Sequence, residues 1–235
     1  MSELSYITEN LKQVGEVIAV AERAACCEGQ TLMLAAVKYG TDEELDALLR
    51  AGVTHVGENR VQQLLDHWPL LERSGASVHF IGSLQTNKVK YIVDKVTMIH
   101  SVDSLRLAAE IDRRARAKGL TMDVLVEING AREEAKSGVM PEEAEALCAE
   151  IAAMPALRLR GFMTMGPRFE DEAGYRAYFA SVKKMGDGIW QRLSLPDEPV
   201  YSMGMSESVA PAIAAGARIV RVGRRLFQND SQPKQ

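Results

Sequence analysis

The sequence predicts a single (β/α)8 barrel of the TIM type with an extra helix at its N-terminus. Eight short apolar segments recur along the chain, and a helix-length segment separates each one from the next. Eight such units in about 200 residues suit a closed parallel barrel better than an open sheet. The 235 residues contain no composition break and no Pro/Gly/Ser linker, so we expect one domain over residues 1–235, with a core of about 5–229 and no second β-domain.

The first half of the chain begins with an amphipathic helix from about Leu4 to Cys27, whose apolar residues recur at helical spacing. A helix begins at Thr41, since Thr is a good N-cap and three acidic residues follow it in the first turn. It ends near Gly52. The other elements expected in this half are strands at 31–37, 54–57, 77–82 and 98–101, a helix that follows residues 58–60 and runs to about 71, and a helix from 86 to 94.

The second half of the chain repeats the alternation of strands and helices, with short connections between them. Asp103 is expected to cap a helix that runs to about Lys118, and Pro141 to begin a helix that runs to about Ala153. The strand at 123–128 is rich in β-branched residues. The remaining elements are strands at 157–163, 200–203 and 218–222, and helices at 171–193 and 207–215.

Composition excludes several classes of protein. A net charge of −4 and a pI near 5.7 argue against a nucleic-acid or anionic-membrane surface. The N-terminus does not resemble a signal peptide, and no apolar run is long enough to cross a bilayer. The three cysteines and four histidines show no metal-binding spacing, and the odd cysteine count points to a reducing cytoplasm. Because no large apolar stripe demands a partner, we expect a monomer.

Lys38 ends the first buried strand and is the first candidate for chemistry. Seven mostly apolar residues precede it, and a Tyr-Gly-Thr-Asp turn follows. Burying its ammonium group would cost several kcal/mol without compensation. Lys38 therefore either reaches out of the barrel mouth into water, or is partly desolvated and suited to imine formation.

Polar residues and glycines also follow the last two strands, where barrels commonly bind phosphate through loop N–H groups and a helix N-terminus. Gly204 and Gly223 would let the backbone approach an anion, and Ser206 offers a hydroxyl just before a helix. Several arginines add positive charge: Arg218, Arg221, Arg224 and Arg225. The alternative to a phosphate site is that Ser206 only caps a helix and that the arginines are solvated surface charges.

Seven segments of the chain form a pattern that is specific when taken together: 36–38, 57–59, 79–88, 136–138, 159–163, 202–206 and 221–223. The most specific parts are His-Phe-Ile-Gly-x-Leu-Gln-x-Asn-Lys and Ser-Met-Gly-Met-Ser. In these segments the chain resembles the pyridoxal phosphate homeostasis protein family, the YggS/PROSC type, which is related to the N-terminal domain of alanine racemase. The resemblance covers about residues 5–229.

This resemblance implies a site for pyridoxal 5′-phosphate (PLP). Lys38 matches the lysine that holds PLP as a Schiff base, and Arg221 matches the arginine that faces the pyridine nitrogen. The phosphate cradle would consist of Ser206 and the backbone around Gly223 and Arg224. The positions that match other residues lining the cofactor are Asn59, His79, Ser83 and Met203.

The resemblance implies a non-catalytic PLP carrier in vitamin B6 homeostasis, which would hand PLP to PLP-requiring apo-enzymes and bind neither nucleic acid nor membranes. The alternative is a PLP-dependent amino-acid racemase or decarboxylase of fold type III, and a weak racemase-like activity stays open. A third reading is a barrel enzyme that acts on phosphorylated metabolites through Lys38. Arg224 departs from the family, in which a small hydroxyl residue is usual. Lys136 is either a solvated charge or part of a mobile lid.

Overall fold

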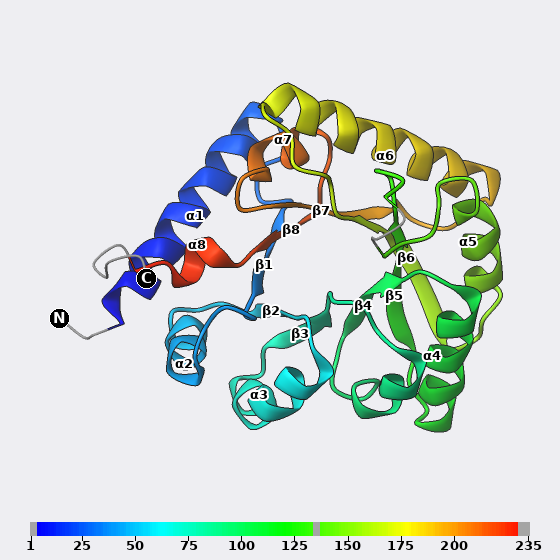
Figure 1. The fold of residues 1–235 in the computed structure, drawn as a ribbon, viewed down its shortest axis with the longest axis horizontal. Coiled ribbons are helices and arrows are strands. Elements are labelled where there is room, and N and C mark those ends of the chain that lie inside the picture. The colour runs from blue at the N-terminus through cyan, green and yellow to red at the C-terminus, as the bar shows by residue number, and fades with distance from the viewer. Residues whose placement is uncertain (1–3, 134–136, 230–235) are drawn as a thin grey trace.

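Eight parallel strands form a closed barrel in the computed structural model, which describes residues 4–133 and 137–229. The strands follow one another around the barrel in sequence order, and β8 (Ile219–Val222) pairs with β1 (Leu32–Ala36) to close it. Helices surround the strands (Figure 1). The predicted TIM-type barrel is therefore confirmed.

The other strands are β2 (His55–Glu58), β3 (Ser77–Phe80), β4 (Met98–Val102), β5 (Met122–Ile128), β6 (Leu157–Thr164) and β7 (Val200–Met205). The helices are α1 (Ser5–Ala24), α2 (Asp42–Arg50), α3 (Val61–Ser74), α4 (Leu105–Ala117), α5 (Ala144–Ala152), α6 (Glu172–Arg192), α7 (Val209–Ala214) and α8 (Arg224–Phe227), with the 3-10 helix η1 (Thr86–Tyr91) between β3 and β4.

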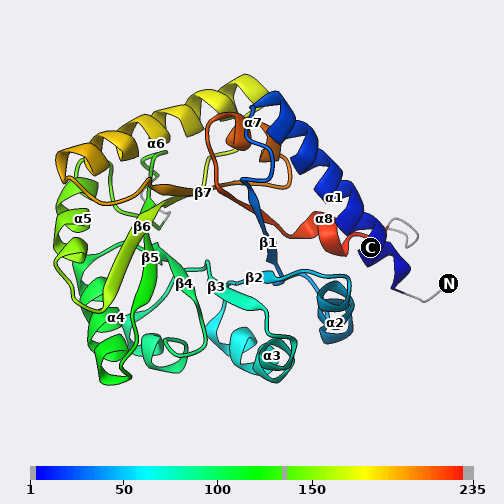
Figure 2. The same ribbon diagram turned by 180° about the vertical axis from the view of Figure 1, so that it is seen from behind.

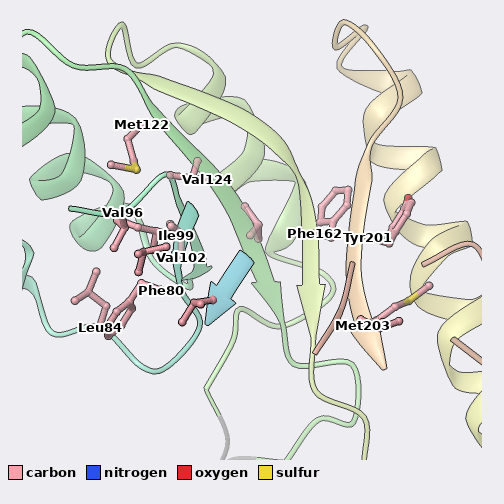
Figure 3. Close-up of a cluster of buried hydrophobic side chains, with 14 of the residues drawn as sticks. Phe80, Leu84, Val96, Ile99, Val102, Met122, Val124, Phe162, Tyr201 and Met203 are labelled. Carbon is pink, nitrogen blue, oxygen red and sulfur yellow. The ribbon is translucent and has the colours of Figure 1, made fainter. Parts of the chain in front are cut away.

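Two apolar layers hold the barrel together. The larger lies between the strands and the helices, and Figure 3 shows part of it, with Phe80, Ile99 and Phe162 buried among their neighbours. The smaller lies inside the barrel and is made of Leu34, Ala36, Ile81 and Ile219. Strands buried on both faces read as nearly continuous apolar runs, which explains the lack of alternation in the sequence.

The extra helix α1 packs beside the C-terminal end of the chain. Its buried residues Ile7, Val14 and Ile18 form one face, as the helical spacing predicts. The Asn10 side-chain amide donates to the backbone oxygens of Leu226 and Gln228, which ties α1 to α8. Figures 1 and 2 both show these two helices side by side. None of the described helices is long and apolar enough to cross a membrane.

Several boundaries differ from the prediction. Thr41 caps α2 as expected, in a reciprocal capping box with Glu44. By contrast, Ser104 and not Asp103 caps α4, because the Ser104 hydroxyl is the group that accepts from the Leu107 N–H. Residues 141–143 form a turn, so the next helix begins three residues after Pro141.

The segment expected as a helix at 86–94 is the shorter 3-10 helix η1, and α8 was not predicted from the sequence. Both are short connections, in which tighter 3-10 turns and single helical turns are common. Between β3 and β4, and from β8 to residue 229, the described residues therefore form only these short helical turns.

Candidate cofactor site

A cavity of about 240 Å³ opens at the carboxyl ends of the strands, where the sequence placed the site. Residues at or just after the carboxyl ends of β1, β2, β3, β6, β7 and β8 line it. A larger and more open groove of about 760 Å³ lies elsewhere, between the C-terminal half of α6 and the segments before β1 and β8. The smaller cavity gathers most of the predicted polar residues, so it is the candidate site.

Lys38 lies at the mouth of this cavity. Its side chain is exposed, and its Nζ lies 4.9 Å from the centre of the Tyr39 ring. The β1 strand ends two residues earlier, and Ala36 and Val37 are buried beneath the lysine. Of the two alternatives for Lys38, the structure shows the one in which the amine reaches water. An amine on the rim of a cavity is accessible to a ligand that enters it.

The loops after β7 and β8 form one wall of the cavity. Ser206, Gly223 and Arg224 line it, as predicted, together with Gly204. Gly204 has a φ of +90°, and a Cβ there would lie 2.5 Å from the Cβ of Ala212. A Cβ at Gly223 would lie 3.0 Å from the backbone oxygen of Ala36. Gly204 therefore needs glycine, and Gly223 leaves little room for a side chain, so backbone is exposed to the cavity at both positions.

Positive charge surrounds this wall. Arg168 and Arg224 both line the cavity, and each guanidinium lies within 4.0 Å of the Glu207 carboxylate between them. The three side chains are largely exposed, so these ion pairs are weak. An anion entering the cavity would compete with Glu207 for two arginines. Arg168 was not among the predicted site residues.

Asn59 lines the opposite side of the cavity and carries a buried side-chain oxygen that has no hydrogen-bond partner among the described residues. Its position depends on Gly82, because a Cβ on Gly82 would lie only 2.0 Å from the Asn59 backbone oxygen. The Gly-Glu-Asn and Phe-Ile-Gly segments are thus in contact across β2 and β3. A ligand with a hydrogen-bond donor would satisfy the Asn59 oxygen, which otherwise costs about 1–3 kcal/mol.

Arg221 forms the floor of the cavity and is 5% exposed. Its NH1 donates to the backbone oxygen of Ser202 at 2.6 Å and to the Ser202 hydroxyl at 2.8 Å, while its NH2 donates to the backbone oxygen of Thr164 at 2.9 Å. Burial lowers the pKa of Arg221 to about 10, although Glu127 and Tyr178 act in the opposite direction. The guanidinium is therefore a fixed cation and a hydrogen-bond donor at neutral pH.

Glu127 is a buried carboxyl group that sequence reasoning missed. It is 5% exposed, and burial together with the nearby charge of Asp103 raises its pKa to about 7, against the effect of Arg221. Glu127 belongs to β5, which also contains Asp123, and the sequence gave no sign of which face Glu127 occupies. Only closure of the barrel places it near Arg221.

Arg218 and Arg225 do not line the cavity, and neither do three residues of the predicted cofactor site. His79 is buried inside the barrel, where its ring nitrogens contact His55 and His100. Ser83 is exposed on the segment after β3. Met203 packs in the apolar layer between β7 and the helices (Figure 3). Lys136 lies outside the described residues.

Other residues line the cavity without having been predicted. Tyr39, which is 49% exposed, stands next to Lys38, and Thr164 and Tyr175 come from β6 and α6. Thr164 ends a strand, and strand ends at this face of a barrel are where functional side chains lie. That signal could have found Thr164, whereas no sequence signal marked Tyr175.

Comparison with known proteins agrees with this geometry. A family model described as the alanine racemase N-terminal domain matches residues 7–229. A protein of Aquifex aeolicus named pyridoxal phosphate homeostasis protein is 39% identical over 220 residues, covering 93% of this chain and 96% of that protein.

Two solved structures are similar over most of their length. A protein of Bifidobacterium adolescentis described as unknown is 35% identical with a TM-score of 0.85, covering 94% of both chains. PipY of Synechococcus elongatus, solved with PLP bound, is 27% identical with a TM-score of 0.83, covering 94% of this chain and 100% of its own. The resemblance drawn from the sequence motifs is confirmed: this chain belongs to the pyridoxal phosphate homeostasis protein family, within the alanine racemase N-terminal domain group.

Proposed function

We propose that this protein binds PLP reversibly, through a Schiff base on Lys38, and acts in intracellular PLP homeostasis as a carrier without strong catalytic activity. The observation that carries the proposal is the convergence of an amine, a fixed cation and a glycine-lined wall on one cavity: Lys38, Arg221, Gly204 and Gly223. The names of the relatives support the same reading.

The residues present fit the chemical groups of PLP. PLP supplies an aldehyde that joins an amine with loss of water, a ring hydroxyl, a pyridine nitrogen and a phosphate. Lys38 offers the amine, and the unpartnered Asn59 oxygen offers an acceptor for the hydroxyl. Arg221 offers a donor to the ring nitrogen, and Arg168 and Arg224 with the glycine-lined wall would hold the phosphate.

Arg221 is the reason to propose a carrier and not a racemase or decarboxylase. A guanidinium held by two backbone oxygens and a hydroxyl keeps its protons, so it leaves the pyridine nitrogen unprotonated. An unprotonated ring withdraws electrons weakly, which disfavours carbanion chemistry. Such a site is better suited to holding PLP and passing it to PLP-requiring apo-enzymes.

The experiment that tests this function is an absorption titration with PLP and, in parallel, with pyridoxal, which lacks the phosphate. The wild type should bind PLP with a visible absorption band that Lys38→Ala lacks. Replacing both Arg168 and Arg224 by Ala should weaken PLP binding by about tenfold or more and leave pyridoxal binding nearly unchanged.

The matched control is Arg192→Ala, because Arg192 is an exposed arginine on α6 that pairs with Glu145 and does not line the cavity. Amino-acid racemase and decarboxylase assays of the PLP-loaded protein should show no appreciable turnover. The proposal fails if PLP does not bind, or if the loaded protein turns over an amino acid at an ordinary enzymatic rate.

A further inference from the structure

A continuous chain of polar side chains runs through the interior of the barrel beneath the cavity. The Arg221 NH1 lies 2.8 Å from the Ser202 Oγ, which lies 3.0 Å from the His100 Nδ1. The His100 Nε2 lies 2.9 Å from the His79 Nδ1, and the His79 Nε2 lies 3.2 Å from the His55 Nδ1. Five residues from five strands are linked in this way.

These polar residues share the barrel interior with the small apolar cluster, whereas large branched apolar residues usually fill a TIM barrel. His100 and Ser202 are fully buried, and His79 is 4% exposed. His55 begins β2, at the amino end of the barrel, and is only half-buried. The chain therefore connects the floor of the cavity with the opposite face of the barrel.

Arg221 fixes the direction of every hydrogen bond in the chain. A guanidinium donates and never accepts, so the Ser202 Oγ accepts from it. The Ser202 hydroxyl then has its own proton to donate, and the His100 Nδ1 receives it. The remaining proton of each neutral ring lies on Nε2, so His100 donates to His79, and His79 donates to His55.

The opposite direction would leave a buried proton without a partner. If the His100 Nδ1 carried the proton and donated to Ser202, the Ser202 hydroxyl would need another acceptor. Within the described residues, its only hydrogen-bond contacts are Arg221 and His100. A fully buried hydroxyl without an acceptor is unfavourable, so the direction from Arg221 to His55 is preferred.

We propose that Ser202, His100 and His79 are positioning residues that hold Arg221 toward the cofactor through a one-way chain of hydrogen bonds between neutral histidines. The role of these three residues in cofactor binding rests on the proposed function, whereas the chain of hydrogen bonds is a property of the protein without cofactor. Its consequence is that the orientation of Arg221 depends on a buried network that ends at His55, on the far side of the barrel.

The surroundings of the chain agree with neutral rings. Burial, and then the neighbouring His55, lower the pKa of His79 to about 4, and burial lowers the pKa of His100 well below its ordinary value, with His79 and Arg221 adding to the effect. Glu127 is the buried carboxyl group that acts on Arg221 from β5. Protonating any ring of the chain would place two donors face to face.

His67 is not part of the hydrogen-bonded chain, so its ring provides an internal reference for the tautomers of the other three histidines. Its Nδ1 lies 2.6 Å from the Oε1 of Glu58, so His67 carries a proton on Nδ1 when that carboxyl group is ionised. This hydrogen bond raises the pKa of His67. Because the protein has only four histidines, the four rings can be resolved and compared in a single spectrum.

The test is a long-range ¹H–¹⁵N correlation spectrum of the ¹⁵N-labelled protein without added cofactor at pH 7. His55, His79 and His100 should be neutral with the proton on Nε2, unlike His67. Ser202→Ala should then change the His100 signals and shift or broaden the guanidinium N–H signals of Arg221. PLP should dissociate from that variant about two- to tenfold faster, the effect of one lost hydrogen bond.

The matched control is Ser101→Ala, which removes another buried strand hydroxyl, one that has no partner among the described residues. It should leave the Arg221 signals and the PLP dissociation rate unchanged. A proton on the Nδ1 of His100 in the wild type, or unchanged Arg221 signals in Ser202→Ala, overturns the proposal. If the wild type binds no PLP, the proposed function fails, while the histidine and arginine signals still decide whether the chain exists.

Discussion

Arg221 shows at the scale of one residue how a buried charge can be accommodated. Its guanidinium is 5% exposed, yet two backbone oxygens and one hydroxyl accept from it and a carboxyl group lies nearby. Removing one partner from such a group leaves the rest uncompensated, which is usually more costly than the interaction is worth. The interior of this barrel therefore holds polar acceptors for Arg221 beside its small apolar cluster.

Glu127 carries a prediction about stability and pH. Its pKa in the folded state, about 7, exceeds the ordinary value of 4.5, so the folded protein holds this proton more tightly than the unfolded chain does. Its stability contribution is therefore fully present below pH 4.5 and is lost as the pH rises through 7. Glu127→Gln should be more stable than the wild type by about 1–3 kcal/mol at pH 8.

The measurement is urea unfolding of the two proteins without cofactor, at several pH values between 4 and 8. The curves should converge near pH 4.5, where the wild-type side chain is also neutral, and this convergence is the internal control. A constant difference across the range would show that Glu127 does not titrate as a buried group.

At the scale of the element, the close packing of β6 between β5 and β7 depends on one glycine. The register of β5 and β6 shifts between Val124 and Leu125, and the shifted Leu125 pairs with Gly161. Gly161 has a φ of +146°, and a Cβ there would lie 2.1 Å from the backbone oxygen of Val200 on β7. Glycine is thus what allows three strands to approach one another here.

Gly161→Ala should destabilise the fold by about 3 kcal/mol or more, because the added methyl group meets backbone that cannot move without breaking strand pairing. Gly52→Ala is the matched control. Gly52 also has a positive φ, of +98°, but a Cβ there meets no atom within 4 Å, so its cost should be about 1 kcal/mol. The urea midpoints of the two variants measure the difference, and equal midpoints would contradict this account of Gly161.

The element scale also shows what could be predicted from the sequence. Each expected strand is present within a few residues, because short apolar runs bounded by turn residues are a strong signal. The face that each residue occupies was harder to predict. Ser202 and Met203 are adjacent and both buried, yet one points into the barrel and the other packs against the helices. A strand buried on both faces shows no alternation from which to choose.

At the scale of the whole molecule, closure of the barrel assembles the candidate site. Lys38, Asn59 and Arg221 are far apart in the sequence and line one cavity, because β1 lies between β2 and β8. The rule that barrel sites lie at the carboxyl ends of strands was enough to predict this grouping. The sequence did not show how deep along the barrel axis each side chain lies. His79 was therefore expected in the cavity, whereas it lies beneath the cavity in the hydrogen-bonded chain of polar residues.

The central claim is that Lys38 anchors PLP, and the most direct measurement is borohydride reduction of the PLP-loaded protein followed by peptide mapping by mass spectrometry. Reduction converts the imine into a stable secondary amine, so the labelled lysine can be identified. We expect loss of the visible band and a single labelled peptide that contains Lys38. A label on another lysine such as Lys88, or a protein that stays colourless with added PLP, would contradict it.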